Sequence, residues 1–220
     1  MTSPYDDSTS LMDPLYFKTR YSPDRNRSRV WKAICEYLQV FIPPDGVVLD
    51  IGAGYCDFIN QIKAAQKYAL DANPNVANFC APGIRFFSGE VGSPLGIPPH
   101  SVDVVLASNL LEHLSEQQCS DLFDRLDEVL KERGKLILIQ PNYYYCYRQY
   151  WDDFTHVRPF SHVSLSDFLR SKGYKIVRVE KKFMPFSFKS LLPKSYWVTK
   201  VYLSSFWRPL AKQMLIVAER

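Results

Sequence analysis

The chain has 220 residues with a net charge of +4 and 46% hydrophobic residues, a composition typical of a folded globular domain and not of a disordered segment. Its length fits one domain with a terminal appendage and excludes two full domains. No apolar run reaches the roughly 18 residues that span a bilayer. The N-terminus MTSPYDDSTS also lacks the basic and apolar regions of a signal peptide, so we expect a cytoplasmic protein.

The five cysteines are scattered along the chain and never form a C-x-x-C pair: Cys35, Cys56, Cys80, Cys119 and Cys146. This pattern indicates neither a disulfide framework nor a zinc site, and we expect no metal.

Positive charge is concentrated near the two ends of the chain. Residues 180–220 carry eight Lys or Arg against two Glu, and a second basic cluster runs through residues 18–32. The net charge is too small to indicate nucleic acid binding, and no nucleic-acid reader motif is present. We therefore do not expect a nucleic acid partner.

The first 15 residues are rich in Ser, Thr, Asp and Pro and are predicted to form a flexible arm. Residues 16–220 are predicted to form a single domain, in which residues 16–45 make an N-terminal helical cap. Apolar residues recur at helical spacing over residues 28–41, and Pro43 and Pro44 stop the pattern.

Short β-branched runs then alternate with helical patterns. The predicted strands cover residues 47–51, 67–70, 84–87, 102–107, 135–139, 174–179 and 213–218, and the predicted helices cover 58–65, 74–80, 115–131 and 164–171, with Gly134 as a helix breaker. This alternation predicts an α/β fold with a doubly wound, mostly parallel, seven-stranded sheet. In such sheets ligands bind at the carboxyl ends of the strands.

The first strand runs through VVLDIGAGYCDF at residues 47–58 into a glycine turn and a helix. Gly52 and Gly54 permit a tight turn and let the backbone approach a ligand closely. A dinucleotide motif would have a third glycine where Asp57 stands, and this carboxylate would oppose a pyrophosphate. A cofactor with a sulfonium and an ammonium group suits Asp50 and Asp57 better, and Asp71 after the second strand can accept hydrogen bonds from ribose hydroxyls.

Over residues 47–140 the sequence resembles the class I S-adenosylmethionine-dependent methyltransferases. DIGAGYC is similar to their glycine motif, with Cys56 in place of the usual last glycine; SVDVVLASNLLEHL at 101–114 and KERGKLILIQPN at 131–142 are similar to their fourth- and fifth-strand motifs. The resemblance implies a Rossmann-like methyltransferase fold. It also implies that S-adenosylmethionine contacts Asp50, Gly52, Ala53, Gly54, Asp71, Ala72, Gly89, Glu90, Val91, Ser108 and Asn109.

The segment PNYYYCYRQYWDDFTHVRPFSH at 141–162 follows a strand's carboxyl end and is predicted to be a lid. If D-D-x-x-H is a helical turn, Asp153 can orient His156, which would then act as an acid, a base or an acceptor ligand. His156 could equally tie down the loop. His113 is a third catalytic candidate or a packing residue, and Glu112 either caps or pairs at a helix start or touches a ligand.

Residues 183–210 are predicted to be a basic, aromatic helical insertion before the last strand. This insertion could contact an anionic membrane through residues 183–208, cover the acceptor site or form a homodimer interface. Together with the lid it loosely resembles methyltransferases of bacterial surface polysaccharide and sugar modification. This implies O-methylation of a sugar, a glycan or another small polar metabolite. Two alternatives remain open: a binding module without transferase activity, and an NAD-dependent oxidoreductase.

Overall fold

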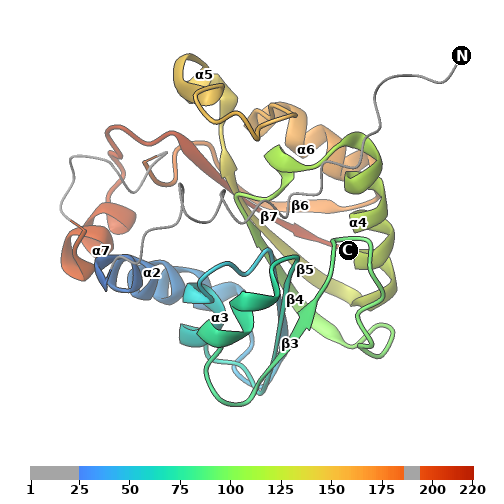
Figure 1. Ribbon diagram of the computed structural model, residues 1–220. Coiled ribbons are helices and arrows are strands. Elements are labelled where there is room, and N and C mark those ends of the chain that lie inside the picture. Colours follow the sequence, from blue (N-terminus) through green and yellow to red (C-terminus); the bar gives the residue numbers. More distant parts are fainter. Residues whose placement is uncertain (1–24, 186–193) are drawn as a thin grey trace, which may run out of the picture.

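The computed structural model describes residues 25–185 and 194–220, so the predicted arm at 1–15 lies outside the described residues. Seven strands form one sheet in the order β3-β2-β1-β4-β5-β7-β6, in which β7 is antiparallel to both of its neighbours (Figure 1). The strands are β1 Val47–Ile51, β2 Gln66–Asp71, β3 Ile84–Ser88, β4 Val102–Ser108, β5 Leu130–Pro141, β6 Lys175–Glu180 and β7 Gln213–Glu219. The predicted mostly parallel, doubly wound sheet is therefore confirmed.

The strand order changes direction between β1 and β4. From β1 the chain proceeds outward through β2 and β3, and then returns to place β4 on the other side of β1. Ile51 is in register with Leu70 of β2 and with Ala107 of β4, so these parallel strands end at the same edge. Such a switch point is where open α/β sheets bind their ligands.

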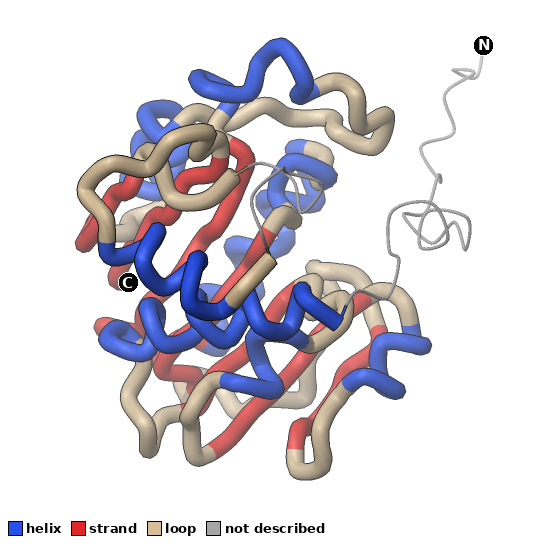
Figure 2. Tube along the Cα trace, turned by 90° about the vertical axis from the view of Figure 1, so that its left-hand side faces the viewer, coloured by secondary structure: helices blue, strands red, loops and turns tan. Residues whose placement is uncertain are grey.

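Helices cover both faces of the sheet (Figures 1 and 2). On one face α4 (Glu116–Val129) and α6 (His162–Ser171) share a buried core with Leu136 and Leu138 of β5. On the other face α2 (Arg25–Leu38), α3 (Asp57–Gln61) and α7 (Tyr196–Ser204) share a core with Ile137 and Ile139. Alternate residues of this central strand therefore enter opposite cores, as expected for a strand buried on both faces.

The helix after the glycine turn is shorter than predicted. It ends at Gln61 because the chain turns extended at Ile62, and the backbone N–H groups of Ala65 and Gln66 then bond to Gly46 O. The short helix predicted at 74–80 is the 3-10 turn η2 (Pro74–Phe79), which Asn73 caps by accepting a hydrogen bond from Asn75 N. The expected N-terminal helix is α2 followed by the 3-10 turn η1 (Gln39–Phe41).

The role predicted for Gly134 is wrong. Helix α4 already ends at Val129, and Gly134 lies inside β5, next to Arg133 at φ +64°. A Cβ on Gly134 would lie 2.8 Å from Lys131 O, so glycine permits an irregularity in the strand. Leu130 is fully buried and pairs with Val102, and this pairing starts the strand five residues before the predicted position.

The predicted lid contains a helix that the aromatic pattern did not indicate, α5 (Tyr143–Tyr150). Helix α6 begins two residues earlier than predicted because Ser161 and Ser164 form a capping box. Within residues 25–185 and 194–220, no helix combines the length and the apolar character needed to cross a membrane.

Candidate active site

The glycine turn after β1 has the backbone conformation that its sequence predicts. Gly52 has φ +70° and Gly54 has φ +53°, both in the left-handed region that favours glycine. The N–H of Gly52 donates to Leu70 O at 2.8 Å, which fixes the turn against β2. A Cβ on Gly52 would lie 3.2 Å from Leu110 Cδ1, so the turn packs closely against the segment that follows β4.

Asp71 at the end of β2 holds the turn from the other side. Its Oδ2 accepts a hydrogen bond from Gly54 N at 2.9 Å, and its Oδ1 accepts one from Asn73 N at 2.9 Å. Burial raises the pKa of Asp71, and these two hydrogen bonds oppose the rise. This carboxylate therefore orders the glycine turn, in addition to its predicted contact with ribose.

Asp50, at the end of β1, is only 3% exposed. Burial, and then the nearby Asp71 charge, raise the pKa of Asp50 to about 8. A hydrogen bond from the backbone of Ile59 opposes this rise. Without a ligand the Asp50 carboxyl group is therefore mainly protonated at pH 7, and a bound cation would favour its ionised form.

Cys56 occupies a conformation that glycine would adopt more easily. Its φ is +56°, so the departure from the glycine pattern places a side chain in the left-handed region. The thiol is fully buried, with Sγ 3.2 Å from Cys80 Sγ and 3.8 Å from Val76 O. Cys56 therefore packs under the turn, away from solvent.

Asp57 does not act as the sequence interpretation assumed. Its Oδ2 lies 2.6 Å from Arg27 Nε of α2, so the expected negative charge facing the cofactor is offset by a protein cation. The charge argument against a pyrophosphate therefore rests mainly on Asp71.

The remaining predicted cofactor residues lie at the same sheet edge. Ala53 and Ala72 flank the glycine turn and Asp71, and Gly89 N donates to Asp71 O at 3.1 Å just after β3. Glu90 is exposed, whereas Val91 is half-buried. Ser108 is the last residue of β4, and Asn109 follows it.

Asn109 has φ +50°, and its Oδ1 accepts a hydrogen bond from Gln213 Nε2 at 2.7 Å. This bond ties the segment after β4 to the start of β7. The roles of these residues toward the cofactor remain predictions.

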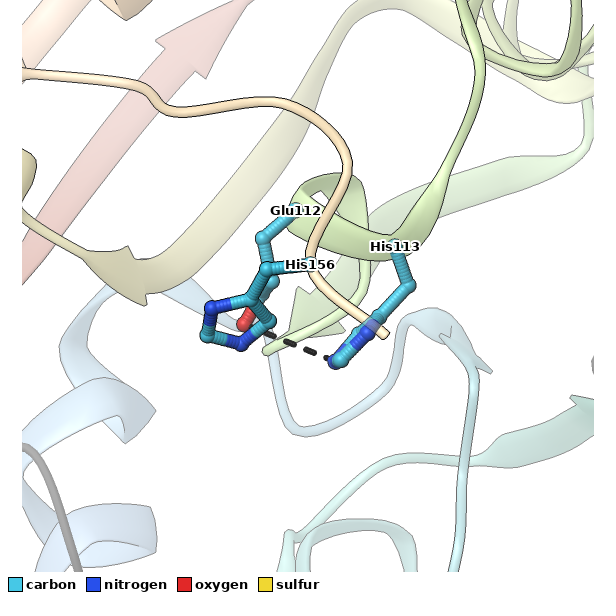
Figure 3. A group of neighbouring side chains, drawn as sticks. All are labelled: Glu112, His113 and His156. Carbon is cyan, nitrogen blue, oxygen red and sulfur yellow. Dashed lines mark ion pairs between the residues drawn. The ribbon is translucent and has the colours of Figure 1, made fainter. Parts of the chain in front are cut away.

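Two of the catalytic candidates meet at this edge together with a third side chain. Glu112 and His113 come from the 3-10 turn η3 (Leu111–His113), and His156 comes from the lid loop (Figure 3). One nitrogen or oxygen ligand atom from each of the three side chains lies within 4.8 Å of the others. Backbone hydrogen bonds from Val157 N and Arg158 N to Glu112 O connect the lid to η3 at this point.

The hydrogen bonds described for Asp153 connect it to Thr155, and its predicted pairing with His156 stays a prediction. Among the described hydrogen bonds, Asp153 Oδ1 accepts from Thr155 N at 3.2 Å and from Thr155 Oγ1 at 2.7 Å. Thr155 Oγ1 lies 3.0 Å from His113 Nδ1. The D-D-x-x-H segment is a turn in which His156 N donates to Asp153 O, and Asp153 therefore acts on His113 through Thr155.

The sequence interpretation underrated two buried polar residues. Glu112 is 2% exposed, and burial raises its pKa to about 8; the backbone N–H of Glu112 opposes the rise and the charge of Asp153 adds to it. Gln140 at the end of β5 is 1% exposed, and neither atom of its amide has a hydrogen-bond partner among the described residues. In the sequence, Glu112 and Gln140 are indicated only as polar residues that stand beside an apolar run.

The expectation of no metal ligands considered the cysteines and did not consider this group. Glu112 and His113 are adjacent, but His156 follows much later in the chain, so no local spacing could indicate the group of Glu112, His113 and His156.

The basic aromatic insertion is described from residue 194 onward, and the part at 186–193 lies outside the described residues. Its helix α7 packs against α2, where Lys200 Nζ lies 2.8 Å from Glu36 Oε2. Trp197 and Trp207 are 69% and 76% exposed. The described part of the insertion therefore covers the N-terminal helix and leaves an aromatic surface in solvent.

A doubly wound sheet whose switch point carries a glycine turn, the buried carboxyl group of Asp50 and the half-buried one of Asp71 is typical of an α/β protein that binds a nucleotide-like cofactor. A family model described as a methyltransferase domain matches residues 49–138. A phosphoethanolamine N-methyltransferase of Plasmodium falciparum is 23% identical over 176 residues, which is 74% of this chain. The chain spans 58% of the length of that relative.

Solved structures share the fold at low identity. A SAM-dependent methyltransferase from Archaeoglobus fulgidus has a TM-score of 0.68 and 20% identity, with 94% of this chain and 98% of that chain covered. A geranyl diphosphate methyltransferase in complex with SAM has a TM-score of 0.63 and 14% identity over 86% of this chain and 85% of its own. Residues 49–138 thus match a methyltransferase domain, and the chain shares its fold with SAM-dependent methyltransferases, whose cofactor is S-adenosylmethionine.

The residues at the sheet edge fit this cofactor. A Cβ at Gly52 would lie 3.2 Å from Leu110 Cδ1, so glycine lets the turn pack closely against Leu110. Asp50 and Asp71 place two carboxyl groups beside the turn, where a cationic ligand lowers the free energy of their ionised forms. The alternative of an NAD-dependent oxidoreductase has no support from the family match.

Proposed function

We propose that this protein transfers the methyl group of S-adenosylmethionine to an oxygen of a small polar acceptor, such as a sugar or a glycan. The observation that carries the proposal is the meeting of Glu112, His113 and His156 beside the cofactor turn. Leu110, two residues before this group, packs on Gly52, so the cofactor turn and the group belong to one edge of the sheet.

A hydroxyl acceptor keeps its proton until it attacks, so a nearby base assists the reaction. When bound, S-adenosylmethionine supplies an electrophilic methyl group. The acceptor oxygen forms a bond to the methyl carbon, the carbon–sulfur bond breaks with both electrons remaining on sulfur, and the hydroxyl proton passes to a ring nitrogen. Both imidazoles have Nδ1 near a carbonyl oxygen, which favours the tautomer with the lone pair on Nε2.

The exposed aromatic side chains of the lid favour a polar acceptor that also has apolar faces. Tyr144, Tyr147 and Trp151 are exposed on or next to α5. Such rings offer rigid apolar surfaces, and Tyr and Trp add a polar group at the edge. A sugar ring presents both kinds of surface, which is why we favour it as the acceptor class.

A second candidate function is N-methylation of a small amine. It is supported by the similarity to the phosphoethanolamine N-methyltransferase of Plasmodium falciparum. A neutral amine attacks through its own lone pair and needs a base only to remove a proton from the ammonium form. The two candidates therefore predict different dependence on the imidazoles.

The test measures S-adenosylmethionine affinity by calorimetry and S-adenosylhomocysteine release across sugar and amine acceptors. We expect turnover with sugar acceptors, and a loss of about 100-fold or more in His156→Asn at unchanged cofactor affinity, because general base catalysis contributes about 10²–10⁴-fold.

His100→Asn is the matched control, since His100 lies before β4 at the opposite end of that strand. Turnover only with amines would replace the proposal by the second candidate. Cofactor binding without turnover on any acceptor would show a binding module.

A further inference from the structure

We propose that Glu112, His113 and His156 form a binding site for a divalent transition-metal ion of the Zn²⁺ type. The three residues lie on η3 and on the lid loop, and their side chains point toward one another (Figure 3). Two imidazoles and one carboxylate form a donor set that occurs in zinc and iron sites of proteins. The methyl transfer does not require this ion, so the site goes beyond the proposed function.

The distances fit an open form of such a site. His113 Nε2 lies 4.0 Å from Glu112 Oε1, and one ligand atom of each residue lies within 4.8 Å of the others. Tetrahedral zinc with ligand bonds of about 2.0–2.1 Å places its ligand atoms about 3.3 Å apart. A contraction of about 1 Å is therefore needed, which side-chain rotations can supply.

Both imidazoles are held as metal-ligating imidazoles usually are. His156 Nδ1 lies 2.7 Å from the carbonyl oxygen of Tyr150, and His113 Nδ1 lies 3.2 Å from the carbonyl oxygen of Thr155. A carbonyl oxygen only accepts, so each Nδ1 carries the proton and each Nε2 carries the lone pair. Histidine ligands of metals are generally oriented by such a bond from their other nitrogen.

The carboxylate provides an independent observation. Glu112 is 2% exposed, and its Oε2 has no hydrogen-bond partner among the described residues. A buried carboxylate without such partners is unfavourable unless a cation or a proton neutralises it. A metal ion would supply the missing partner of Oε2.

The donor set selects the class of ion. Mg²⁺ and Ca²⁺ prefer all-oxygen sites, whereas imidazole nitrogen suits Zn²⁺ and its neighbours in the first transition row. Three protein ligands leave at least one position for water. With the ion bound both Nε2 lone pairs are ligands, so the base catalysis of the proposed function belongs to the ion-free form.

The experiment uses the full chain after treatment with a chelator that is then removed. Zn²⁺ affinity and stoichiometry are measured by competition with a chromophoric chelator, and Co²⁺ is added separately to record the visible absorption of bound ion. We expect one ion per chain, and an affinity about 10-fold or more lower in Glu112→Gln and in His156→Asn. His100→Asn removes an imidazole outside the cluster and is expected to bind as the wild type does.

Mg²⁺ is the contrasting ion and should not displace Zn²⁺. Absence of Zn²⁺ binding to the wild type, or equal affinity in the ligand variants and the control, would overturn the site. If a variant fails to fold, the Co²⁺ spectrum of the wild type still tests the proposed site. A spectrum identical to that of aqueous Co²⁺ would exclude imidazole ligation.

The two proposals fail separately. Zn²⁺ binding without methyl transfer would leave the metal site and remove the proposed function. Methyl transfer at full rate by a protein that binds no Zn²⁺ would leave the proposed function and remove the metal site.

Discussion

The cofactor turn at residues 47–58 and the lid at residues 141–162 lie at the same edge of the sheet but are built differently. The turn is stabilised largely by backbone conformation, with Gly52 and Gly54 at positive φ and the Asp71 carboxylate on Gly54 N. In the lid, contacts to a distant segment decide the geometry. Hydrogen bonds from Val157 N and Arg158 N to Glu112 O hold the lid loop against η3, where His156 lies beside Glu112 and His113.

The two regions correspond to the two parts of the proposed transfer reaction, which are cofactor binding and acceptor binding. The turn is predicted to bind a cofactor whose shape is constant, so local sequence can specify it. The acceptor side is assembled from η3 and from the lid loop, and the chemistry there depends on how the two segments meet.

The largest expected effect tests the turn. Asp71→Ala removes the acceptor of two backbone hydrogen bonds and the predicted ribose contact, so we expect S-adenosylmethionine affinity to fall about 100-fold or more, since hydrogen bonds to charged groups contribute about 1.5–3 kcal/mol each. Calorimetric titration measures the affinity. Asp71→Asn keeps one acceptor oxygen, so its affinity for S-adenosylmethionine should lie between those of the wild type and Asp71→Ala. Unchanged affinity in Asp71→Ala would remove the assignment.

The next effect tests the lid. Asp153→Ala removes the acceptor for Thr155 N and Thr155 Oγ1, which loosens the contact of Thr155 with His113. We expect turnover to fall about 10-fold, as for the loss of an outer partner that orients a functional histidine. The KM for the cofactor should stay the same. Asp153→Asn retains an acceptor oxygen and should restore most of the rate; if it fails to do so, the positioning role is wrong.

A third effect uses the raised pKa of Asp50. Its folded-state pKa is about 8 and its ordinary value is 3.8, so the folded protein retains a proton that the unfolded chain loses between these values. The contribution of Asp50 to stability is therefore fully present below about pH 4 and is lost as pH rises to about 8.

Asp50→Asn stays neutral and still offers an oxygen to the backbone of Ile59. Denaturant unfolding of the cofactor-free protein from pH 5 to 9 should show the wild type losing stability relative to Asp50→Asn. Parallel pH profiles of the two proteins would contradict the assignment.

The smallest effect concerns Cys56. Cys56→Gly relieves a left-handed conformation that costs a residue with a Cβ about 1–2 kcal/mol, but it also removes a buried thiol from its contacts with Cys80 and Val76. The two terms oppose each other, so we expect the thermal midpoint to change by only a few degrees and cofactor affinity to stay within about twofold of the wild type. A large loss of affinity would show that the Cys56 side chain shapes the cofactor site. Cys80→Ala is the control for the lost thiol contact.

The sequence by itself determined the fold class and the position of the cofactor edge. Alternating strand and helix patterns, and an acidic glycine turn directly after a strand, depend on local periodicity and on the conformational freedom of glycine. These signals located β1 and the turn within a residue of their observed positions. The same local reasoning failed at Gly134, because the burial of Leu130 and its pairing with Val102 override a helix-breaking residue.

Only the tertiary structure decided which side chains meet. In the folded chain Asp57 forms an ion pair with Arg27, and Asp153 accepts a hydrogen bond from Thr155. The tertiary structure also brings His156 to Glu112 and His113. These contacts join segments that are far apart in the chain, and their geometry follows from the packing of the lid against η3. A single sequence holds the residue types but not the distances between them.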